Sequence, residues 1–445
     1  MSAKGASPRA LLEALFHAGL SAVDAQRAVS RAVSDAREPS APLRVLDETL
    51  PGHAQIVALA AGKAACAMAQ ALEERAGPRL ARGLAVTKDG HALPLRRFRV
   101  REASHPVPDA RSAAAGCEAL ALAASTREDE VFVVLLSGGA SALLSTPPEG
   151  VSVADLARTN AALLGSGAAI GELNAVRKHL SQISGGRLAV AAPAGRIFLL
   201  AISDVPGDAL DVIGSGPCTA DPSTFADALA VLRRHGLADP GVLPARVIAR
   251  LEAGVAGAGE ETPKPGDRRL ERVRSAVLAR NADAVEAARD AARARGLEAR
   301  VAVRGLAGEA RIAGERLAAL GDALRPADAP RVLVAGGETT VTLEGTGRGG
   351  RNQELALAAA LRLAGRDRVA LLAAGTDGSD GPTDAAGAYV DGGTVSRGAA
   401  AGQDAEGALR RHDSHGFFAA EGGLFRTGPT HTNVMDLALL HLAAG

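Results

Sequence analysis

The stretch that decides the fold is Val131-Phe132-Val133-Val134-Leu135-Leu136, which is followed at once by Ser137-Gly138-Gly139. Six consecutive apolar residues, rich in β-branched side chains and closed by a glycine turn, are typical of a strand buried on both faces. Strands of this kind occur in parallel sheets that are covered by helices. The sequence therefore predicts an open α/β sheet, in which ligands lie beyond the carboxyl ends of the strands.

The same rhythm of a short apolar run, a turn and a helical stretch recurs along the chain. Helices are predicted at 64–74 and 351–364, and another begins at Ser7 and Pro8, an N-cap and a first-turn residue. Asn281 is a candidate cap for a further helix. Strands are predicted at 56–60, 197–202, 275–279, 331–335, 339–343 and 369–374, whereas 434–442 is apolar and fits either a strand or a helix.

A stretch of small, polar and proline residues at 253–267 is typical of a surface loop or linker. We place a domain division after it and expect an N-terminal domain at 7–252 and a C-terminal α/β region at 268–445. Strands and helices alternate on both sides of this loop, which favours two α/β domains.

Composition and charge exclude several classes of protein. The 445 residues are 47% hydrophobic and 22% charged, which fits a soluble globular chain and not a disordered or fibrous one. Fifty Lys and Arg balance fifty Asp and Glu, and only 2% of residues are aromatic, so we expect no nucleic-acid partner. No apolar stretch reaches the roughly 18 residues of a membrane span, so we expect no membrane partner. Three scattered cysteines indicate a reducing, cytoplasmic setting.

Three glycine-bearing turns at predicted strand ends are candidate anion sites: Gly62-Lys63, 137–139 and 345–350. Backbone N–H groups approach a phosphate closely where no Cβ intrudes, and a helix N-terminus adds partial positive charge. Lys63 and Arg351 stand beside two of these turns. A solvated lysine is the simpler explanation of Lys63 taken alone. Arg351 is less easily explained, because the helix dipole disfavours a cation there unless an anion binds beside it.

Two of these turns match known nucleotide motifs only in part. The turn at Lys63 is not a phosphate-binding P-loop, because Val57 stands where the first glycine is needed and Ala64 follows the lysine. The glycines in 345–350 satisfy the pattern G-x-G-x-x-G, but the acidic residue should follow about 20 residues on, and Asp377 lies further away. A nicotinamide site is therefore disfavoured.

Aspartates gather after two predicted strands, at 204–211 and 377–384. They are either turn residues, which satisfy their own backbone, or ligands of Mg²⁺, which takes one or two carboxylates with phosphate oxygens and water. Asp204 and Asp377 are the candidate metal ligands. The histidines of the segment 412–415 are predicted to lie in a polar surface loop.

Taken in order, these motifs resemble those of the class II glycerate kinases (glycerate 2-kinases), whose C-terminal part is called the MOFRL domain. The likeness runs from about the first helix to the C-terminus. In the first half it is carried by Gly62-Lys63-Ala64-Ala65, His105-Pro106-Val107-Pro108-Asp109, Leu136-Ser137-Gly138-Gly139-Ala140-Ser141, Asn174-Ala175-Val176-Arg177-Lys178-His179-Leu180-Ser181, Ile202-Ser203-Asp204-Val205-Pro206-Gly207-Asp208 and Gly214-Ser215-Gly216-Pro217. In the second half it is carried by Gly336-Gly337-Glu338-Thr339-Thr340-Val341, Gly349-Gly350-Arg351-Asn352-Gln353-Glu354, Gly375-Thr376-Asp377-Gly378 and Thr427-Gly428-Pro429-Thr430.

The resemblance implies phosphorylation of D-glycerate to 2-phosphoglycerate with ATP and Mg²⁺. It implies a Rossmann-like N-terminal domain with a parallel sheet, a smaller α/β C-terminal domain that includes MOFRL at about 330–442, and a site between the two domains. It also places the family's catalytic lysine and arginine at Lys63 and Arg351.

On this hypothesis, ATP phosphates lie on the glycine turns, and Mg²⁺ bridges the phosphate oxygens near Asp204 or Asp377. Lys63 and Arg351 meet at the transferring phosphoryl group or at the glycerate carboxylate. The candidate residues for binding nucleotide or substrate are Ser137, Gly138, Gly139, Asn174, Lys178, Gly336, Gly337, Glu338, Asn352 and Asn433.

The sequence departs from the family pattern at three positions, and two other functions remain open. Ala60 and His431 replace expected glycines and Cys218 replaces an expected threonine, so the backbone at the first two positions is in question.

The alternatives to a glycerate kinase are an NAD(P)H-dependent hydroxypyruvate reductase, a label also given to members of this family, and a non-catalytic sensor of nucleotides or sugar acids. A homodimer is compatible with the sequence.

Overall fold

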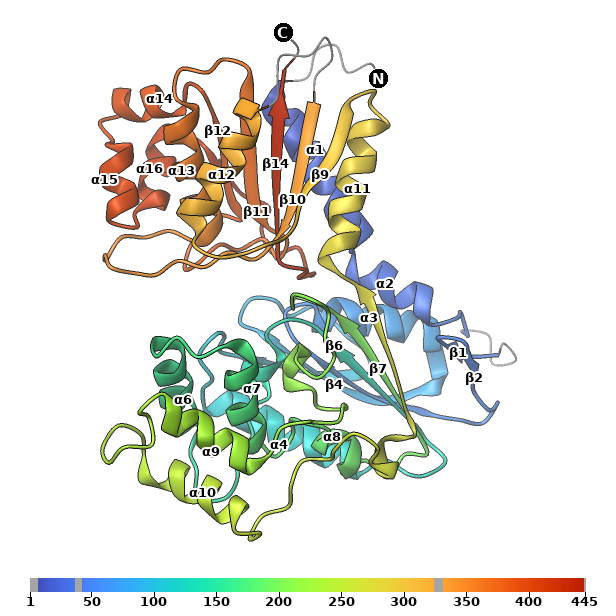
Figure 1. The fold of residues 1–445 in the computed structure, drawn as a ribbon. Helices are drawn as coiled ribbons and strands as arrows, with labels where there is room; N and C mark the ends of the chain where they lie inside the picture. Colours follow the sequence, from blue (N-terminus) through green and yellow to red (C-terminus); the bar gives the residue numbers. More distant parts are fainter. Residues whose placement is uncertain (1–6, 37–41, 324–330, 444–445) are drawn as a thin grey trace. The chain divides into compact units, whose positions relative to one another are not determined.

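The protein is described by a computed structural model, which covers residues 7–36, 42–323 and 331–443. The chain divides into two compact units. The contiguous unit is Ala25–Leu278, and the discontinuous unit combines Met1–Asp24 with Ala279–Gly445. Each unit is built around one six-stranded sheet (Figure 1).

The sheet of the contiguous unit has the strand order β5-β4-β3-β6-β7-β8. Neighbouring strands from β5 to β7 run parallel. The strands are β3 (Ile56–Ala61), β4 (Leu80–Lys88), β5 (Phe98–Ala103), β6 (Val131–Leu136), β7 (Arg196–Ile202) and β8 (Val273–Ala279), with a separate antiparallel pair, β1 (Arg44–Val45) and β2 (Glu48–Thr49). The α-helices are α2 (Ala25–Ala32), α3 (Ala65–Ala76), α4 (Ala110–Ala124), α5 (Ala140–Leu143), α6 (Val153–Gly165), α7 (Ile170–His179), α8 (Arg187–Ala191), α9 (Phe225–Arg234) and α10 (Ala245–Val255).

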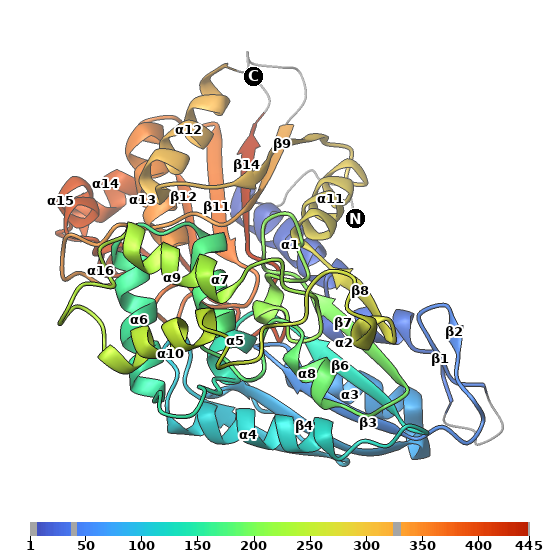
Figure 2. The same ribbon diagram turned by 60° about the horizontal axis from the view of Figure 1, so that its bottom comes forward.

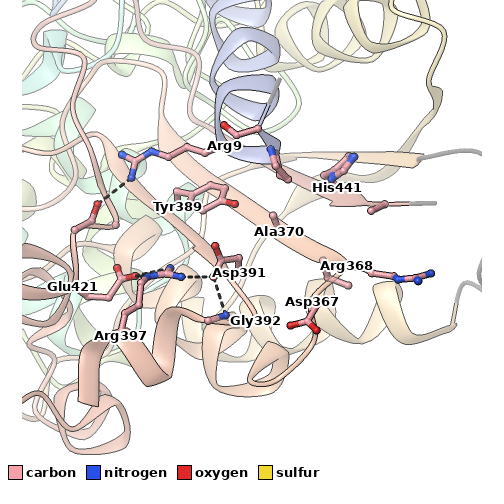
Figure 3. A pocket seen from close by; sticks show the side chains of 17 residues that line it. Arg9, Asp367, Arg368, Ala370, Tyr389, Asp391, Gly392, Arg397, Glu421 and His441 are labelled. Atoms are coloured by element: carbon pink, nitrogen blue, oxygen red, sulfur yellow. Dashed lines mark hydrogen bonds and ion pairs between the residues drawn. The ribbon is translucent and has the colours of Figure 1, made fainter. Parts of the chain in front are cut away.

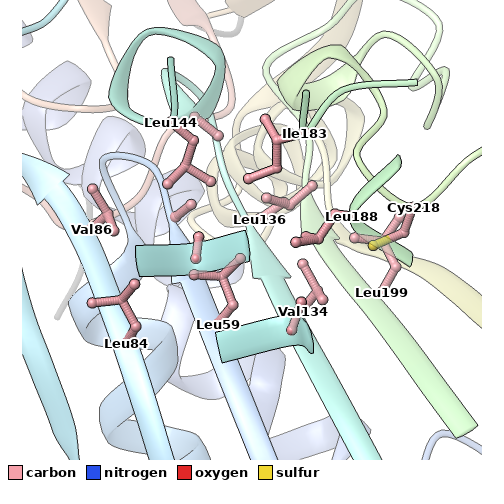
Figure 4. Packing of buried hydrophobic residues seen from close by; sticks show 14 of the residues in the cluster. Leu59, Leu84, Val86, Val134, Leu136, Leu144, Ile183, Leu188, Leu199 and Cys218 are labelled. Atoms are coloured by element: carbon pink, nitrogen blue, oxygen red, sulfur yellow. The ribbon is translucent and has the colours of Figure 1, made fainter. Parts of the chain in front are cut away.

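The central strands of this sheet are buried on both faces, as their unbroken apolar sequences predict. Every residue of β3 and β6 is buried. On one face, Leu59, Val134 and Leu199 pack with Leu188 of α8 in a continuous core (Figure 4). Burial of each such side chain contributes about 1.5–3 kcal/mol, so this core holds the strand ends rigidly in register.

The register of β3 and β6 places two loops beside each other. Ala61 lies opposite Leu136, so the two parallel strands end level. Figure 2 shows β3 and β6 as neighbours in the sheet. The turns at 62–63 and 137–139 therefore leave the same edge of the sheet side by side.

The sheet of the discontinuous unit is mixed and has the order β13-β12-β11-β14-β10-β9. The last strand in sequence, β14, runs antiparallel between β10 and β11, while β9 runs parallel to β10. The strands are β9 (Glu298–Leu306), β10 (Arg331–Gly337), β11 (Val369–Gly375), β12 (Gly387–Asp391), β13 (Leu424–Phe425) and β14 (Asp436–Leu442). The α-helices are α1 (Pro8–Ala22), α11 (Asn281–Arg293), α12 (Ala310–Ala323), α13 (Arg351–Leu363), α14 (Thr394–Ala400), α15 (Ala405–Arg410) and α16 (Ser414–Glu421).

Helix α1 is a structural part of the discontinuous unit although it begins the chain. It packs beside α11 and against β11 and β14 (Figure 1). Its apolar residues Leu12, Leu15 and Phe16 are fully buried, and the Phe16 ring meets Phe425 edge-on at 5.2 Å between centroids. On the opposite face of the sheet, buried residues of α12 and α13 pack with residues of β10, β11 and β14 in one core. The mixed sheet is therefore closed on one side by the chain's first helix.

Most predicted elements are confirmed, and both units have the expected α/β fold. Ser7 caps α1 by accepting a hydrogen bond from the backbone N–H of Ala10. The predicted strands at 56–60, 131–136, 197–202, 275–279, 331–335 and 369–374 and the helices at 64–74 and 351–364 all form within a few residues of their expected bounds, and the ambiguous stretch 434–442 contains β14.

Two local predictions are wrong. The segment 339–343 is not a strand, because after β10 only Thr340 makes an isolated bridge, to Glu309. Asn281 does not cap α11 but is its first residue, and Arg280 is the N-cap. The amide of Asn281 instead donates to the backbone carbonyls of Val434 and Asp436, at 2.8 and 3.0 Å.

The domain division differs from the predicted 7–252 and 268–445. Helix α1 belongs with the C-terminal sheet, and β8 belongs with the N-terminal sheet. The chain therefore passes from one unit to the other after Asp24 and returns after Leu278. The segment 253–267 begins inside α10, and its remainder is fastened within the contiguous unit, where Thr262 donates to the buried carboxylate of Asp221. The predicted loop is confirmed for 256–267, which form no helix or strand, but this loop lies within one unit and is not a linker between domains. Residues 324–330 and 444–445 of the predicted C-terminal region lie outside the described residues.

Among the described residues, no helix is both long enough and apolar enough to cross a membrane.

Candidate functional site

Two turns of the contiguous unit, Gly62-Lys63 and Ser137-Gly138-Gly139, are joined by hydrogen bonds. The backbone N–H of Lys63 donates to the carbonyl of Gly138 at 2.9 Å. The next N–H, that of Ala64, donates to the Ser137 hydroxyl at 3.0 Å. These bonds fix the backbone from which the half-buried Lys63 side chain extends. The structure therefore brings Lys63, Ser137 and Gly138 together.

The turns can approach this closely because their glycines lack a side chain. Gly62 has φ of +123°, and a Cβ there would lie 2.2 Å from Ser137 Oγ. Gly139 has φ of +89°, and a Cβ there would lie 3.0 Å from Nε2 of His105. His105 therefore lies against the predicted site, although the sequence analysis did not include it among the binding residues.

The glycine turn after β6 keeps backbone donors available. Among the described residues, the N–H groups of Gly138 and Gly139 make no hydrogen bond, whereas those of Lys63 and Ala64 are engaged. Unpaired N–H groups at a strand end are the donors with which glycine turns bind phosphate or carboxylate. This turn is therefore chemically suited to an anion. Asp204 follows β7, the strand next to β6, and is half-buried.

Asn174 and Lys178 lie one turn apart on α7 and are both buried. The ammonium of Lys178 lies 3.3 Å from a carboxylate oxygen of Asp211 and 3.3 Å from one of Asp221. Lys178 is therefore engaged in a buried charge network. The amide nitrogen of Asn174 is buried and has no hydrogen-bond partner in the described part of the chain, so it is the residue of this pair with an unmet donor.

In the discontinuous unit, Arg351 is held by carboxylates. Its Nε and Nη2 donate to the two oxygens of Asp436 at 2.6 and 2.8 Å, and Nη1 lies 2.9 Å from Glu338 Oε1. Burial alone would lower the pKa of Arg351, but the neighbouring carboxylates of Asp436 and Glu338 raise it well above its usual range. The guanidinium therefore stays charged and fixed in direction.

A second carboxylate explains how a cation can sit at the N-terminus of α13. Asp380 accepts hydrogen bonds from the backbone N–H groups of Asn352 and Gln353 at 3.0 and 2.8 Å. Burial, together with the charge of Asp436, raises the pKa of Asp380 to about 6, against the effect of those N–H groups. The protein itself therefore supplies the negative charge that the sequence analysis assigned to a bound anion.

The other predicted residues of this unit are placed near β10 and β14 in different roles. Gly336 and Gly337 are the last residues of β10 and not a turn. A Cβ on Gly336 would lie 2.2 Å from Asn281 Oδ1, so that glycine serves the packing of α11. The side-chain amide of Asn352 donates to Asp380 at 3.3 Å. Asn433, also buried, accepts from the backbone N–H of Met435 at 3.4 Å.

The glycine loop 345–350 packs against another loop and lacks the setting of a dinucleotide motif. Such a motif opens directly from a strand, whereas β10 ends at Gly337, well before this loop. A Cβ on Gly347 would lie 2.4 Å from the carbonyl of Arg411, and one on Gly350 would lie 2.3 Å from Asp380. The glycines therefore permit close packing of two loops. This geometry gives no support to a nicotinamide site at 345–350.

The histidines of 412–415 are not at the surface, so that prediction is wrong. His412 is 2% exposed, and its Nδ1 lies 2.9 Å from Glu354 of α13. His415 is also buried, and its Nε2 lies 2.8 Å from Asp384. Both partners lie far away in sequence. They pair with the histidines inside the unit, and the contact with Glu354 joins this segment to α13.

Asp377 is buried after β11, and one of its oxygens accepts from the backbone N–H and the hydroxyl of Ser379 at 2.9 and 3.0 Å. In the described residues, no three His, Cys, Asp or Glu side chains form a group that could hold a metal ion. Mg²⁺ bound with nucleotide needs only one or two carboxylates, so Asp204 and Asp377 fit that donor chemistry.

A pocket of about 610 Å³ lies at the other edge of the mixed sheet and contains none of the predicted residues (Figure 3). Several of its charged groups are engaged with one another or with the backbone. Arg397 pairs with Asp391 and Glu421, at 2.9 and 2.7 Å. Arg9 donates to the carbonyls of Gly422 and Leu424 and fastens α1 to the sheet. We assign this pocket a structural role.

The departures from the expected glycines have different consequences. His431 has φ of 57°, a left-handed conformation that favours glycine and costs other residues about 1–2 kcal/mol. Ala60 lies in the middle of β3 and pairs regularly with Ala85 and Leu135. Cys218 is buried, and burial raises its pKa to about 12, so the thiol stays protonated.

Two α/β units with glycine turns, buried carboxylates and oriented cations near strand ends are typical of an α/β enzyme. Comparison with known proteins identifies the family. The family profile described as domain of unknown function DUF4147 matches residues 11–252, and that of the MOFRL family matches 331–436. A D-glycerate 2-kinase of Thermotoga maritima is 41% identical, over 89% of this chain and 94% of its own length. The chain belongs to the glycerate kinase family with a MOFRL domain.

Two further relatives bear on fold and function. A crystal structure of a glycerate kinase from Thermotoga maritima matches with a TM-score of 0.81 at 38% identity, over 98% of this chain and 100% of that one. A protein of Agrobacterium vitis named putative hydroxypyruvate reductase is 41% identical, over 92% of this chain and 93% of its own length. The family therefore carries two functional names.

Proposed function

We propose that the protein transfers the γ-phosphoryl group of ATP to the 2-hydroxyl of D-glycerate, giving 2-phosphoglycerate and ADP. The hydroxyl oxygen forms a bond to the γ-phosphorus, the bond from that phosphorus to the β,γ-bridging oxygen breaks, and the hydroxyl proton is released. The observation that carries the proposal is Arg351, a charged guanidinium fixed by Asp436 at the edge of a sheet, in a chain whose kinase relatives match it over most of its length.

Each proposed residue has a part in this reaction. The free N–H groups of Gly138 and Gly139 bind phosphate oxygens, and Ser137 holds that turn against the one that bears Lys63. The ammonium of Lys63 and the guanidinium of Arg351 offset the charge that develops on the transferring group or the glycerate carboxylate. Asn174, Glu338, Asn352 and Asn433 orient polar groups of the ligands, and Lys178, Gly336 and Gly337 support the surrounding backbone.

Mg²⁺ would neutralise the phosphate charge when it is bound with ATP, and Asp204 and Asp377 are the residues that would hold it. Lys63 belongs to the contiguous unit and Arg351 to the discontinuous unit. Because the proposal needs both cations, either unit alone is expected to be inactive.

The test is a coupled assay that separates the positions of phosphorylation. The purified protein is incubated with ATP, Mg²⁺ and D-glycerate, and the product is offered to enolase with and without phosphoglycerate mutase. We expect a product that enolase uses directly, because enolase acts on 2-phosphoglycerate. A product that needs the mutase would assign the 3-position, and release of ADP without any phosphoglycerate would reject the kinase.

The name of the Agrobacterium vitis relative supports testing one other activity. Hydroxypyruvate with NADH or NADPH replaces glycerate and ATP in a parallel assay, and oxidation of the nicotinamide is followed by absorbance. The packing of the glycine loop 345–350 leads us to expect no oxidation. Binding of ATP and glycerate with no turnover in either assay would favour a non-catalytic sensor of nucleotides or sugar acids.

A further inference from the structure

The segment 214–216 of the contiguous unit holds a serine in a backbone conformation that favours glycine. All three residues have positive φ, of 57°, 59° and 60°. The two glycines adopt this conformation without strain, whereas Ser215 between them is strained. Ser215 is 1% exposed, and its backbone is fixed on both sides, because its N–H donates to Val212 at 2.9 Å and its carbonyl accepts from Gly185 at 3.0 Å. A strained residue that its surroundings keep in place points to a role for its side chain.

The side chain of Ser215 is linked to the glycine turn after β6 through Ser141. The two Oγ atoms lie 2.8 Å apart. Ser141 lies on α5, two residues beyond Gly139 of the turn with the unpaired N–H groups. The two segments pack directly against each other, since a Cβ on Gly214 would lie 3.2 Å from that of Ala140. Ser141 is half-buried, whereas Ser215 is closed off from solvent, so only the hydroxyl of Ser141 can reach a ligand.

The surroundings of the two hydroxyls decide which one donates. Each serine hydroxyl has one proton to donate and two lone pairs that accept. Among the described residues, Ser141 is the only hydrogen-bond partner of the Ser215 hydroxyl. If Ser141 donated, the proton of Ser215 would be buried without an acceptor, which is costly. Ser215 therefore donates to Ser141, and Ser141 keeps its own proton for a third group.

We propose that Ser141 is a further ligand-binding residue of the glycine turn and that Ser215 is its positioning residue. Ser141 donates its hydroxyl proton to an anionic oxygen that the N–H groups of Gly138 and Gly139 also bind. The inference rests on the proposed function, because that function supplies the anion. The oxygen belongs to a phosphate of ATP or to the carboxylate of glycerate, and either one accepts the same bond.

The bond from Ser215 makes Ser141 a more effective donor. It occupies one lone pair of Ser141 Oγ and so restricts the directions in which the proton can point. A hydroxyl that accepts one hydrogen bond also donates a stronger one. A donor that is fixed before the ligand arrives needs no reorganisation when charge develops on the acceptor. A glycine at position 215 would relieve the backbone strain but lose this bond, which explains why a serine stands there.

The first test removes the donor. Ser141→Ala should lower kcat/KM for glycerate phosphorylation 10- to 100-fold, because a hydrogen bond to a charged oxygen is lost. Ser125→Ala is the matched control, since Ser125 follows α4 and precedes the opposite end of β6, and its hydroxyl donates to the carbonyl of Leu122 at 2.8 Å. Near-wild-type turnover in Ser141→Ala would overturn the proposal.

The second test separates a positioning role of Ser215 from a structural one. Ser215→Gly loses the hydroxyl but suits the positive φ, so its Tm should match or exceed that of the wild type while kcat/KM falls three- to tenfold. Ser215→Ala keeps the strain and loses the same hydroxyl, so its kcat/KM should fall equally. In the Ser141→Ala background, Ser215→Gly should change kcat/KM less than twofold. Equal losses in both backgrounds, or a loss in Ser215→Gly that Ser215→Ala does not share, would overturn the proposal.

The KM values identify the anion. A rise in the KM for ATP in Ser141→Ala, with the KM for D-glycerate unchanged, would assign the bond to a phosphate that ATP keeps in the ground state. The reverse would assign it to the glycerate carboxylate. A fall in kcat with both KM values unchanged would assign it to the transferring phosphoryl group, and no change in any of the three would overturn the proposal.

Calorimetric binding of inorganic phosphate tests this inference apart from the proposed function. A wild-type protein that makes no phosphoglycerate rejects the function, and the same variants are then compared by their Kd for phosphate. We expect weaker binding in Ser141→Ala and Ser215→Gly and wild-type binding in Ser125→Ala. Equal affinity in all of these proteins, or no binding to the wild type, would overturn the inference by itself.

Discussion

The two units fix their cations by different means. In the contiguous unit the backbone does the work, since two glycine turns are joined by the Lys63 N–H, the Gly138 carbonyl and the Ser137 hydroxyl. In the discontinuous unit side chains do it, because Asp436 binds the Arg351 guanidinium from 85 residues away. A site made from strand-end turns is written in a few consecutive residues. A site made from paired side chains depends on which strands become neighbours.

The largest effect is expected for the packing of α1, which distinguishes the discontinuous unit from the contiguous one. Phe16→Ala removes a fully buried ring that contacts Phe425, and should cost about 3–5 kcal/mol of unfolding free energy. Hydrogen exchange read by mass spectrometry should show lost protection in β11 and β14 and unchanged protection in β3 and β6. Ile312→Ala, an exposed position of α12 in the same unit, is the control. Equal loss in both units would contradict their separation.

The next effect compares the two cations directly. Lys63→Ala and Arg351→Ala should each lower kcat/KM for glycerate phosphorylation by roughly 10²–10³, the usual loss for one preorganised charge contact. Arg31→Ala in the contiguous unit and Arg362→Ala on α13 remove exposed cations as matched controls. Wild-type turnover in either active-site variant would remove that cation from the mechanism.

A smaller effect tests the backbone-built site. Gly62→Ala places a Cβ 2.2 Å from Ser137 Oγ at a positive φ, so the joined turns must separate. We expect a loss of about 2 kcal/mol or more of stability, together with weaker ATP binding. Gly90→Ala has a similar strained φ, of +77°, but open space around it. If the two variants melt alike, the contact between the turns contributes nothing beyond backbone strain.

The smallest effect concerns the side-chain-built site and depends on pH. Burial raises the pKa of Asp380 to about 6 from its ordinary 3.8, so between these values the native state holds a proton that the unfolded chain has released. This group therefore lowers the free energy of unfolding as pH rises from about 4 to about 6.

Asp380→Asn removes that titration while keeping an acceptor at the start of α13. Urea unfolding at pH 4.5 and pH 7 should show the variant gaining on the wild type by about 1–2 kcal/mol at the higher pH. Asp404→Asn at an exposed position is the control. A difference between variant and wild type that does not change with pH would mean that Asp380 is ionised throughout.

The sequence predicted the elements well because their signals are local. Six apolar residues at Val131–Leu136 closed by a glycine turn are typical of a buried strand. The parallel pairing of β3 with β6 then ends the two strands level. The same logic found Lys63 and the turn at Ser137. It failed at 339–343, where the alternating pattern makes only an isolated bridge, from Thr340 to Glu309.

What the sequence did not reveal are the partners of buried charges. Asp436 opens an apolar run whose secondary structure was ambiguous, and only the insertion of β14 between β10 and β11 brings it to Arg351. His412 looked like a surface residue until Glu354 supplied an internal partner. A lone carboxylate at the start of a buried strand is the signal that could have identified Asp436.

The place of α1 in the mixed sheet has a consequence for biosynthesis. Ala22 leaves the ribosome 420 residues before Leu442, the last residue of the strand that α1 covers. At the usual 5–20 residues per second this delay is roughly 20–80 s. Throughout that time Leu12, Leu15 and Phe16 have no sheet to bury them, while the whole contiguous unit can already fold. In the nascent chain, the apolar residues of α1 therefore stay exposed beside a unit that has already folded. Chaperones that bind exposed apolar segments are expected to raise the yield of folded protein.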